Sequence, residues 1–354
     1  MHSSFIDPLL AAASPPKKRD YRGLLNLSSN EASHPLVRAL SHRWAGRWRP
    51  SLHDYIYPPR ELPRIASRLG VSVESLYLTA GADHAIQVVC ASLGRSCGRL
   101  IVRWPNYPNY VRYAEVQGMS VERWWPRAGD DLAVLDCAPA LVVVTSPDAF
   151  TGEQLADEEL DRLATSSAAN GHLLVLDETY GAFAPTCHLD WASRRDNIVI
   201  IRSFSKSLGA AGLRLAAIAA APTLIQYLAR SNAINAVSVA AIDYAVFAFD
   251  ETNELRQAHR AIADVRDRLI ERILAVEPLW RSSRSRANFA WFEAEDVAAA
   301  EAAYDCALAS KIAIRWCHDL AGAERWVRIT AADDDATNRV VAALSEREPR
   351  WRDS

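Results

Sequence analysis

The chain has 354 residues, of which 50% are hydrophobic and 23% are charged, the composition of a globular protein with a large core. At about 150 residues per domain, this length predicts two domains and excludes a disordered chain or a small disulfide scaffold. Forty Lys plus Arg against 43 Asp plus Glu give a net charge of −3, so no basic surplus indicates a nucleic-acid or membrane partner.

The cysteines and the N-terminus indicate a cytoplasmic protein. The six cysteines contain no Cys-x-x-Cys pair and lie mostly in apolar or helical surroundings, which favours reduced, buried thiols. The basic residues at positions 17–19 follow the first apolar stretch, whereas in a secretory signal they precede it. No stretch approaches the roughly 18 uninterrupted apolar residues of a membrane span. We therefore expect a soluble, cytoplasmic protein.

The first 237 residues predict an arm followed by an α/β domain. Four prolines in residues 1–50 (Pro15, Pro16, Pro35 and Pro50) indicate an irregular N-terminal arm. Helices are then predicted over 63–70, 84–93 and 156–168, and strands over 75–79, 99–103, 141–145, 173–176 and 197–202. The strands are continuously apolar, as in strands covered on both faces. Their alternation with helices predicts a mostly parallel, doubly wound sheet in a large domain over 51–237.

The remaining chain has a different pattern. Long helices are predicted over 239–276, and the segments 288–292 and 326–330 are typical of strands. We therefore expect a small α+β C-terminal domain over 238–354.

The segment after the strand 197–202 carries the best-placed amine of the chain. Lys206 is one of only four lysines, and Ser203, Ser205 and Arg214 supply hydroxyl donors and a guanidinium suited to phosphate. A lysine in an apolar pocket beside other cations has a lowered pKa and can form a Schiff base. The alternative is a surface lysine at a strand end beside an arginine.

Asp177 ends the predicted strand 173–176, at the edge of the sheet where α/β proteins bind ligands. It precedes Lys206 by 29 residues, about one strand–helix–strand unit, so both are expected at the same sheet edge. A carboxylate that keeps a ring nitrogen protonated and a lysine that forms an imine are two parts of a pyridoxal phosphate (PLP) site. Alone, Asp177 is equally consistent with a helix N-cap or a loop carboxylate.

A glycine turn opens the helix that follows the strand 75–79. Gly81, Ala82 and Asp83 place backbone N–H groups at a helix N-terminus, where they can bind phosphate. Such a turn is usually only a strand–helix connection. Together with Ser203, Ser205 and Arg214, it would complete one phosphate site.

These residues resemble fold-type I PLP-dependent enzymes of the class I/II aminotransferase group, most closely histidinol-phosphate aminotransferase-like proteins. The resemblance extends from about Tyr21 to Leu344. It rests on motifs in a specific order: Asn30-Glu31, Tyr57-Pro58, Gly81-Ala82-Asp83, Pro105-Asn106-Tyr107, Asp177-Glu178-Thr179-Tyr180, Ser203-Phe204-Ser205-Lys206, Ala211-Gly212-Leu213-Arg214, Asn288-Phe289 and Val327-Arg328-Ile329-Thr330. It implies the α/β fold of that group, with a mostly parallel sheet in the large domain and a smaller α+β C-terminal domain.

The resemblance also implies roles for the matching residues. Lys206 would bind PLP covalently and then transfer protons, Asp177 would pair with the pyridine nitrogen, and Tyr180 would hydrogen-bond the phenolate oxygen of the ring. Tyr107 would stack on the ring face. The phosphate would be held by the turn and the hydroxyl segment, through Gly81, Ala82, Asp83, Ser203, Ser205 and Arg214.

Four further roles are implied around the substrate. Arg328 would clamp its α-carboxylate bidentately, Tyr21 would cover it, and Asn30 would contribute to its binding. Tyr57 would reach the phosphate of the neighbouring subunit, which makes the expected site a product of a homodimer. No metal is expected, because His53, His84, His188 and His318 lack metal-ligand spacing.

One position departs from the family pattern. Members usually carry Asn-Pro-Thr-Gly after a strand, and that Asn donates to the phenolate oxygen of PLP. Here Ala149 takes the Asn position and Phe150 the Pro position, while the carboxylate of Asp148 would repel the phenolate. Losing a donor should raise the pKa of the cofactor imine. Either the change is tolerated because Tyr180 still donates, or the chemistry is retuned.

We expect a PLP-dependent aminotransferase that transfers the amine of an amino acid, or of an amine derived from one, through an external aldimine and pyridoxamine phosphate. The alternative suggested by Ala149 is a PLP-dependent decarboxylase, lyase or cyclase of a specialised pathway. A PLP-binding regulatory module fits less well, because the segment before Tyr21 is too short for a helix-turn-helix domain. A structural protein would have no reason to keep Lys206 and Asp177 in this relation.

Overall fold

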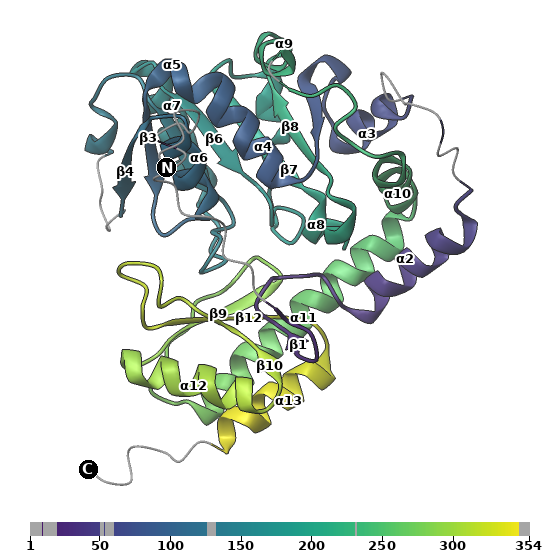
Figure 1. Cartoon of the computed structure of the whole chain (residues 1–354), viewed down its shortest axis with the longest axis vertical. Coiled ribbons are helices and arrows are strands. Elements are labelled where there is room, and N and C mark those ends of the chain that lie inside the picture. Colours follow the sequence, from purple (N-terminus) through teal and green to yellow (C-terminus); the bar gives the residue numbers. More distant parts are fainter. Residues whose placement is uncertain are drawn as a thin grey trace, which may run out of the picture.

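The computed structural model describes residues 9, 20–49, 53, 60–125, 132–230 and 232–346. Its centre is a seven-stranded sheet with the order β2-β8-β7-β6-β5-β3-β4 (Figure 1). The strands are β2 (Leu76–Thr79), β3 (Arg99–Arg103), β4 (Ser120–Trp124), β5 (Leu141–Thr145), β6 (Leu173–Asp177), β7 (Ile198–Ser203) and β8 (Ala216–Ala220). Strand β8 runs antiparallel to both of its neighbours, and the other pairs are parallel. The predicted mostly parallel sheet is thus confirmed.

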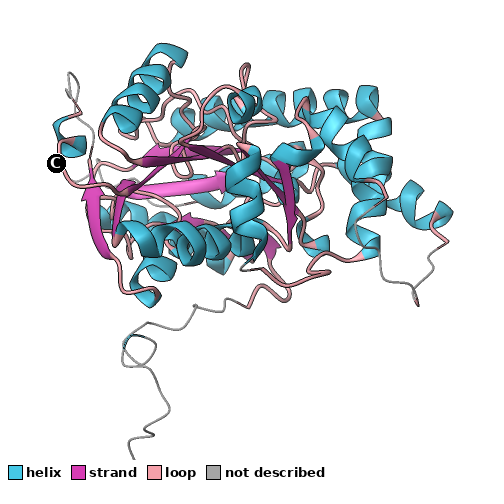
Figure 2. Cartoon of the chain, turned by 90° about the horizontal axis from the view of Figure 1, so that it is seen from above, coloured by secondary structure: helices cyan, strands magenta, loops and turns pink. Residues whose placement is uncertain are grey.

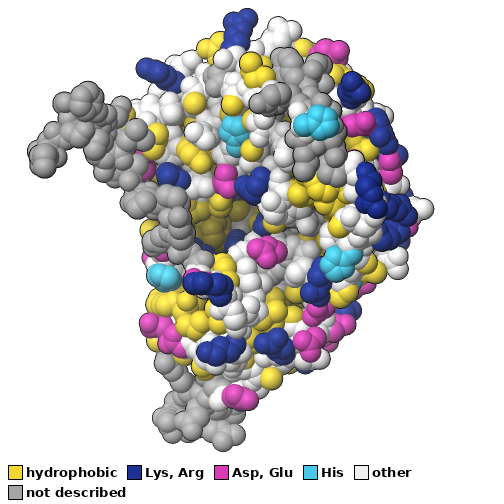
Figure 3. All heavy atoms as spheres, turned by 45° about the vertical axis from the view of Figure 1, so that its right-hand side comes forward, with side chains coloured by type: hydrophobic (Ala, Val, Ile, Leu, Met, Phe, Trp, Pro, Cys, Tyr) yellow, Lys and Arg dark blue, Asp and Glu magenta, His cyan; other side chains and the backbone are white. Residues whose placement is uncertain are grey.

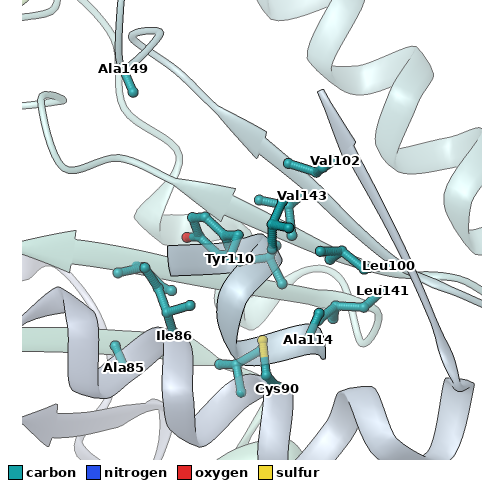
Figure 4. Close-up of a cluster of buried hydrophobic side chains, with 14 of the residues drawn as sticks. Ala85, Ile86, Cys90, Leu100, Val102, Tyr110, Ala114, Leu141, Val143 and Ala149 are labelled. Carbon is teal, nitrogen blue, oxygen red and sulfur yellow. The ribbon is translucent and has the colours of Figure 1, made fainter. Parts of the chain in front are cut away.

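Helices cover both faces of this sheet (Figure 2). On one face, α4 (Ala82–Val89) and α6 (Asn109–Val116) pack on every second strand side chain, as Figure 4 shows for Ile86, Tyr110, Leu100, Val102, Leu141 and Val143. On the other face, α7 (Asp157–Ala169) packs on the alternate side chains, including Val142 and Val144. Because both faces of the inner strands are buried, these strands need apolar residues at nearly every position, as in β5 and β8. The edge strand β4 is mostly exposed and carries polar residues.

The second part of the fold lies below the large sheet in Figure 1. Strands β11 (Arg315–Trp316), β12 (Trp326–Thr330) and β9 (Phe289–Glu293) form an antiparallel sheet in that order. Helices α11 (Thr252–Val276), α12 (Val297–Ala309) and α13 (Asp334–Ser345) pack with it around one core. These elements confirm the predicted α+β character of the region. The boundaries at 50 and 237 stay a prediction.

The remaining α-helices are mostly shorter. They are α3 (Leu62–Leu69), α5 (Arg95–Cys97), α8 (Phe204–Ser207), α9 (Pro222–Arg230) and α10 (Val239–Asp250). The helices predicted over 239–276 are α10 and α11, which are separated at Glu251. None of the helices in the described ranges is long and apolar enough to cross a lipid bilayer.

The expectation of an irregular N-terminal arm is wrong for two segments. Residues 35–47 form helix α2 (Pro35–Arg47), and β1 (Leu25–Asn26) pairs in parallel with β10 (Ile312–Ala313). Pro35 does not break this helix because it is the first helical residue, where a missing N–H costs nothing. The Nδ1 atom of His34 accepts the N–H of Leu36 at 3.2 Å and so caps the helix.

The expectation that the cysteines are buried is also only partly correct. All six are free thiols, and Cys90 and Cys317 are buried. Cys187, by contrast, is exposed, because it lies in the loop between β6 and β7 and not in a sheet strand or core helix.

Candidate active site

A cavity of about 760 Å³ is lined by the carboxyl ends of β5, β6 and β7, by the start of α4, and by β11 and β12. Its lining thus comes from both parts of the fold and from the N-terminal segment around Ser28. Figure 3 shows a face of the molecule that is hollowed near its middle, with hydrophobic and basic side chains around the hollow. The carboxyl edge of a parallel sheet is where α/β proteins place their ligands.

Lys206 lies in α8, the short helix that directly follows β7. Its Nζ atom donates a hydrogen bond to the carbonyl oxygen of Ser29 at 2.7 Å. Burial, together with the positive charges of Arg328 and Arg214, lowers the pKa of the amine from 10.5 to about 8. A substantial fraction of the amine is therefore neutral at mildly alkaline pH, as a nucleophilic or proton-transferring lysine requires.

Asp177 is the last residue of β6 and is 3% exposed. Its Oδ2 atom accepts a hydrogen bond from the Tyr110 hydroxyl at 2.9 Å, and its Oδ1 atom accepts the N–H of Thr179 at 2.9 Å. Burial raises the pKa of this carboxyl, while the hydrogen bonds from Thr179 and Tyr110 oppose the rise. Asp177 thus ends β6, Lys206 lies just beyond the end of the neighbouring parallel strand β7, and both line one cavity.

A group of polar side chains surrounds the N-terminus of α4. The carboxylate of Asp83 accepts hydrogen bonds from Tyr107 Oη at 2.9 Å and from Arg214 Nη2 at 3.2 Å. Arg214 also donates from Nη1 to Ser205 Oγ at 3.4 Å. Gly81 has a φ of +86°, and a Cβ atom there would lie 2.5 Å from Arg214 Nη2. Only glycine therefore allows the guanidinium to lie against this turn.

Arg328 enters the cavity from β12. Its Nη1 donates to the carbonyl oxygen of Ala149 at 2.6 Å, and its Nη2 donates to that of Ser28 at 3.2 Å. The guanidinium carbon lies 5.2 Å from the ring centre of Phe150 and 5.1 Å from that of Phe289. Cation–π attraction and two carbonyls therefore hold the orientation of this arginine.

Tyr180 and Asn30 lie together in the wall. The phenol oxygen of Tyr180 accepts a hydrogen bond from Asn30 Nδ2 at 2.9 Å, and its ring packs edge-on against Phe289. The Asn30 backbone is fixed by a bond from its N–H to Thr330 Oγ1 at 3.0 Å and by a bond to its carbonyl from Asn288 Nδ2 at 2.9 Å. Asn30 is thus engaged with the protein on three sides.

At the position that departs from the family pattern, Ala149 lines the cavity and is 6% exposed. Asp148 does not line it. Its Oδ1 atom accepts the N–H groups of Phe150 and Thr151, each at 2.8 Å, and so closes the turn in its own loop. The side chain at this position therefore brings no donor to the cavity. Burial raises the pKa of Tyr180, and the negative charge of Asp148, although turned into its own loop, still contributes to that rise.

The structure brings nearly all of the predicted site residues to one place. The cavity is lined by Tyr21, Asn30, Ala82, Asp83, Tyr107, Asp177, Tyr180, Ser203, Ser205, Lys206, Arg214 and Arg328. Gly81 lies directly behind Arg214. Tyr57 lies outside the described residues.

Sequence reasoning missed two residues that shape the site, Tyr110 and Arg315, and it foresaw no packing role for Phe150. Tyr110 donates to Asp177, Phe150 packs on Arg328, and Arg315 lines the cavity beside Arg328. Arg315 lies in a short segment with apolar neighbours, but its pairing with the strand that bears Arg328 is visible only in the structure. Tyr110 shows no signal beyond ordinary core patterning, and Phe150 stands out only by taking the Pro position of the family motif.

Comparison with known proteins identifies the family. The family model described as aminotransferase class I and II matches residues 22–344, and the chain belongs to this family. It is therefore a PLP-dependent aminotransferase by family. The chain is 26% identical to histidinol-phosphate aminotransferase 2 of Archaeoglobus fulgidus, covering 97% of this chain and 98% of that protein. It is 28% identical to histidinol-phosphate aminotransferase of Haloferax volcanii, covering 92% and 90%.

Solved structures share the fold. Histidinol-phosphate aminotransferase from Sinorhizobium meliloti, in complex with pyridoxal-5'-phosphate, superposes with a TM-score of 0.83 at 22% identity, covering 97% of both chains. L-threonine-O-3-phosphate decarboxylase from Porphyromonas gingivalis superposes with a TM-score of 0.75 at 20% identity, covering 91% of this chain and 98% of that one. The predicted α/β, fold-type I class is confirmed, and these likenesses concern the fold alone.

The residues of the cavity fit PLP. The cofactor is an aldehyde with an acidic phosphate and a basic ring nitrogen, so it needs an amine, an anion site and a carboxylate. The cavity supplies the amine of Lys206, whose pKa is lowered to about 8, and the buried carboxylate of Asp177. The close approach of Arg214 to Gly81 at the start of α4 supplies a guanidinium beside a helix N-terminus.

Proposed function

We propose that this aminotransferase acts on an amino acid or an amine derived from one, with Lys206 and Asp177 as its catalytic pair. One observation carries the proposal: Asp177 at the end of β6 and Lys206 just after the neighbouring β7 line one cavity, which Arg328 enters from β12. Bound PLP supplies an electron sink for the charge that remains when a substrate loses its α-proton. The protein must bind the substrate, orient it and move that proton.

The roles of the side chains follow from their surroundings. Lys206 Nζ, with its lowered pKa, takes and returns the α-proton. Asp177, fixed by Tyr110 and Thr179, keeps the proton on the ring nitrogen. Tyr180 is the third catalytic residue, and it hydrogen-bonds the phenolate oxygen of the cofactor ring.

Binding is divided between the two ends of the cavity. Arg214, Ser203, Ser205 and the backbone of residues 81–83 hold the phosphate, and Tyr107 stacks on the ring. At the other end Arg328 binds the substrate carboxylate, since a guanidinium matches a carboxylate bidentately. Tyr21 covers the substrate. Asn30, which was expected to contact substrate, is better supported as a residue that holds Tyr180.

Lys206→Ala tests the proposal, with Lys311→Ala as the matched control, because Lys311 is exposed and does not line the cavity. We expect Lys206→Ala to lose the visible absorption of the lysine-bound cofactor and all turnover, and Lys311→Ala to keep both. A Lys206→Ala protein that still cycles substrate would refute the assigned role.

A second candidate function is decarboxylation, elimination or cyclisation, which the missing donor at Ala149 favours. The two candidates differ when a single amino acid is added. An aminotransferase converts its bound cofactor to the amine form and stops, whereas a lyase returns to the lysine-bound form after each turnover. Following the cofactor spectrum and the released product with a panel of amino acids therefore separates them.

We also propose that the enzyme is a cytoplasmic homodimer in which Tyr57 of each subunit reaches the phosphate of the other. Free cysteines support a reducing compartment. Sedimentation equilibrium tests the dimer, and a Tyr57→Phe protein should bind the cofactor more weakly. A monomer that retains full activity would contradict this assembly.

A further inference from the structure

Two arginines lie opposite each other in the small sheet. Strands β11 and β12 are antiparallel, and Arg315 and Arg328 are direct partners in their register. Both line the same cavity. Like charges directly opposite each other in a sheet repel. The groups around each arginine therefore decide how strongly its positive charge acts on a ligand in the cavity.

Arg315 is held by a carboxylate. Its Nη2 forms an ion pair with Asp319 Oδ1 at 2.5 Å, and its Nη1 donates to the carbonyl oxygen of Trp316 at 2.8 Å. The side chains are 8% and 23% exposed, so water screens this pair only weakly. Burial alone would raise the pKa of Asp319, but attraction and hydrogen bonding to Arg315 hold it below its ordinary value. The Asp319 carboxylate therefore stays ionised at neutral pH.

The charge of Arg328 reaches the reacting end of the cavity. It is the strongest of the charges that lower the pKa of Lys206. Its guanidinium is fixed by the carbonyls of Ala149 and Ser28 and by two aromatic rings, all of which are uncharged groups. The other arginines of the lining are Arg112 from α6, Arg123 from β4 and Arg214, whose guanidinium lies at the start of α4.

We propose that Asp319 determines the charge of the substrate group that binds beside Arg315 and Arg328. By forming an ion pair with Arg315, Asp319 leaves a site for one carboxylate and disfavours a phosphate. This inference rests on the proposed function and narrows it to amines that carry a carboxylate. A carboxylate is matched by one guanidinium fork, that of Arg328. A phosphate monoester carries a charge near −2 above about pH 7, and the Asp319 carboxylate repels the additional charge.

Two unreactive acids of similar size test the inference on the cofactor-loaded protein: butyrate and n-propyl phosphate. Dissociation constants are measured by calorimetry at about pH 8, where the phosphate monoester is a dianion. We expect the wild type to bind butyrate more tightly. Asp319→Asn frees the fork of Arg315, so propyl phosphate should bind at least fivefold more tightly relative to butyrate. Asp305→Asn removes an exposed carboxylate from α12, outside the cavity, and should leave the ratio unchanged.

Asp319→Asn leaves the Arg315 guanidinium buried without its carboxylate and could therefore misfold. The double variant Arg315→Gln/Asp319→Asn removes both charges, so it can be measured even if the single variant does not fold. It should keep the butyrate affinity of the wild type within fivefold, because Arg315 takes no part in carboxylate binding. Four results would overturn the inference: a ratio that moves less than fivefold in Asp319→Asn, a wild type that prefers the phosphate, a wild type that binds neither acid, or a fivefold loss of butyrate binding in the double variant.

These measurements do not depend on amine transfer. A failure of the proposed function appears instead as an amine panel that leaves the cofactor spectrum unchanged, or as turnover by Lys206→Ala. The two failures are therefore seen separately.

Discussion

The side-chain amide of Asn30 donates a hydrogen bond to the phenol oxygen of Tyr180 at 2.9 Å, across 150 residues of sequence. Since the amide N–H is the donor, the phenol oxygen is the acceptor, and the hydroxyl proton of Tyr180 is left to point elsewhere. Tyr180 lines the cavity, so this contact prepares its hydroxyl to donate to a ligand there. Asn30 thus orients Tyr180. The hydroxyl of Tyr180 is important because Ala149 supplies no hydrogen-bond donor.

Replacing Asn30 by alanine should destabilise the protein by about 2–4 kcal/mol. The buried phenol loses its donor, which costs about 1–3 kcal/mol, and alanine at the φ of +53° adds about 1–2 kcal/mol of backbone strain. Urea unfolding measures the loss. Asn30→Gly removes the same hydrogen bond without that strain, so it should lose less. If the glycine variant proves the less stable of the two, the backbone at residue 30 is not the strained element.

The predictive power of the sequence differs among the elements of the site. Lys206 and Asp177 follow apolar strands, and the rule that parallel strands end at one sheet edge places them correctly. Strand β8 was not foreseen, because its sequence is four alanines and one isoleucine, and alanine is depleted in strands. Its position between β2 and β7 fixes its conformation through pairing that only the tertiary fold provides.

Contacts between distant segments show the same limit. The ion pair of Arg315 with Asp319 spans only four residues. Its effect on the cavity, however, depends on the strand register that places Arg315 opposite Arg328. Likewise, Pro35 suggests a break when it is considered alone, but it starts a helix of 13 residues. Sequence motifs identified the reactive side chains of the site, but only the tertiary structure shows which groups surround them.

Gly81→Ala should weaken cofactor binding at least tenfold. The new Cβ would lie 2.5 Å from Arg214 Nη2, so the guanidinium must shift from its place at the start of α4, and a φ of +86° disfavours any side chain. The dissociation constant of PLP, from absorbance titration, measures the effect. Gly46→Ala is the matched control, because a Cβ at Gly46 meets nothing within 4 Å and alanine favours the helix. Equal cofactor affinity in Gly81→Ala and the wild type would show that Arg214 is not needed at that turn.

Ala149→Asn should lower the pH at which the absorption of the lysine-bound cofactor titrates. An amide donor at this position would stabilise the charged phenolate, and the Ala149 backbone is already fixed by Arg328. Ala149→Val fills the same buried position without a donor, so it separates size from hydrogen bonding. An unchanged midpoint in Ala149→Asn would mean that Tyr180 already supplies the full stabilisation.

His188→Gln should destabilise the protein more at about pH 6 than at about pH 9. Nδ1 of His188 lies 3.1 Å from Glu178 Oε1, and Nε2 lies 3.2 Å from Asp157 Oδ1. Although burial opposes it, the two carboxylates raise the pKa of His188 above 6.5. Stability from a raised pKa is present below the unfolded value and is lost as the pH rises through the folded value.

Urea unfolding at the two pH values measures the His188 effect, which we expect to reach about 1–3 kcal/mol at the lower pH. His42→Gln serves as the control, because His42 is an exposed residue of α2. A difference between His188→Gln and the wild type that does not change with pH would mean that the imidazole is neutral in the folded protein.

Arg328→Gln should raise the pKa of Lys206. Burial and the charge of Arg328 are the two largest causes that hold this pKa near 8, so removing the charge makes the protonated amine more favourable. The rate at which cofactor-free protein captures added PLP requires the neutral amine, and it should therefore rise through about pH 8 in the wild type and at higher pH in Arg328→Gln. Arg325→Gln removes an exposed charge that pairs with Glu293 and should leave the profile in place. A wild-type midpoint near 10.5, or the same midpoint in Arg328→Gln, would show that the cavity does not tune this amine.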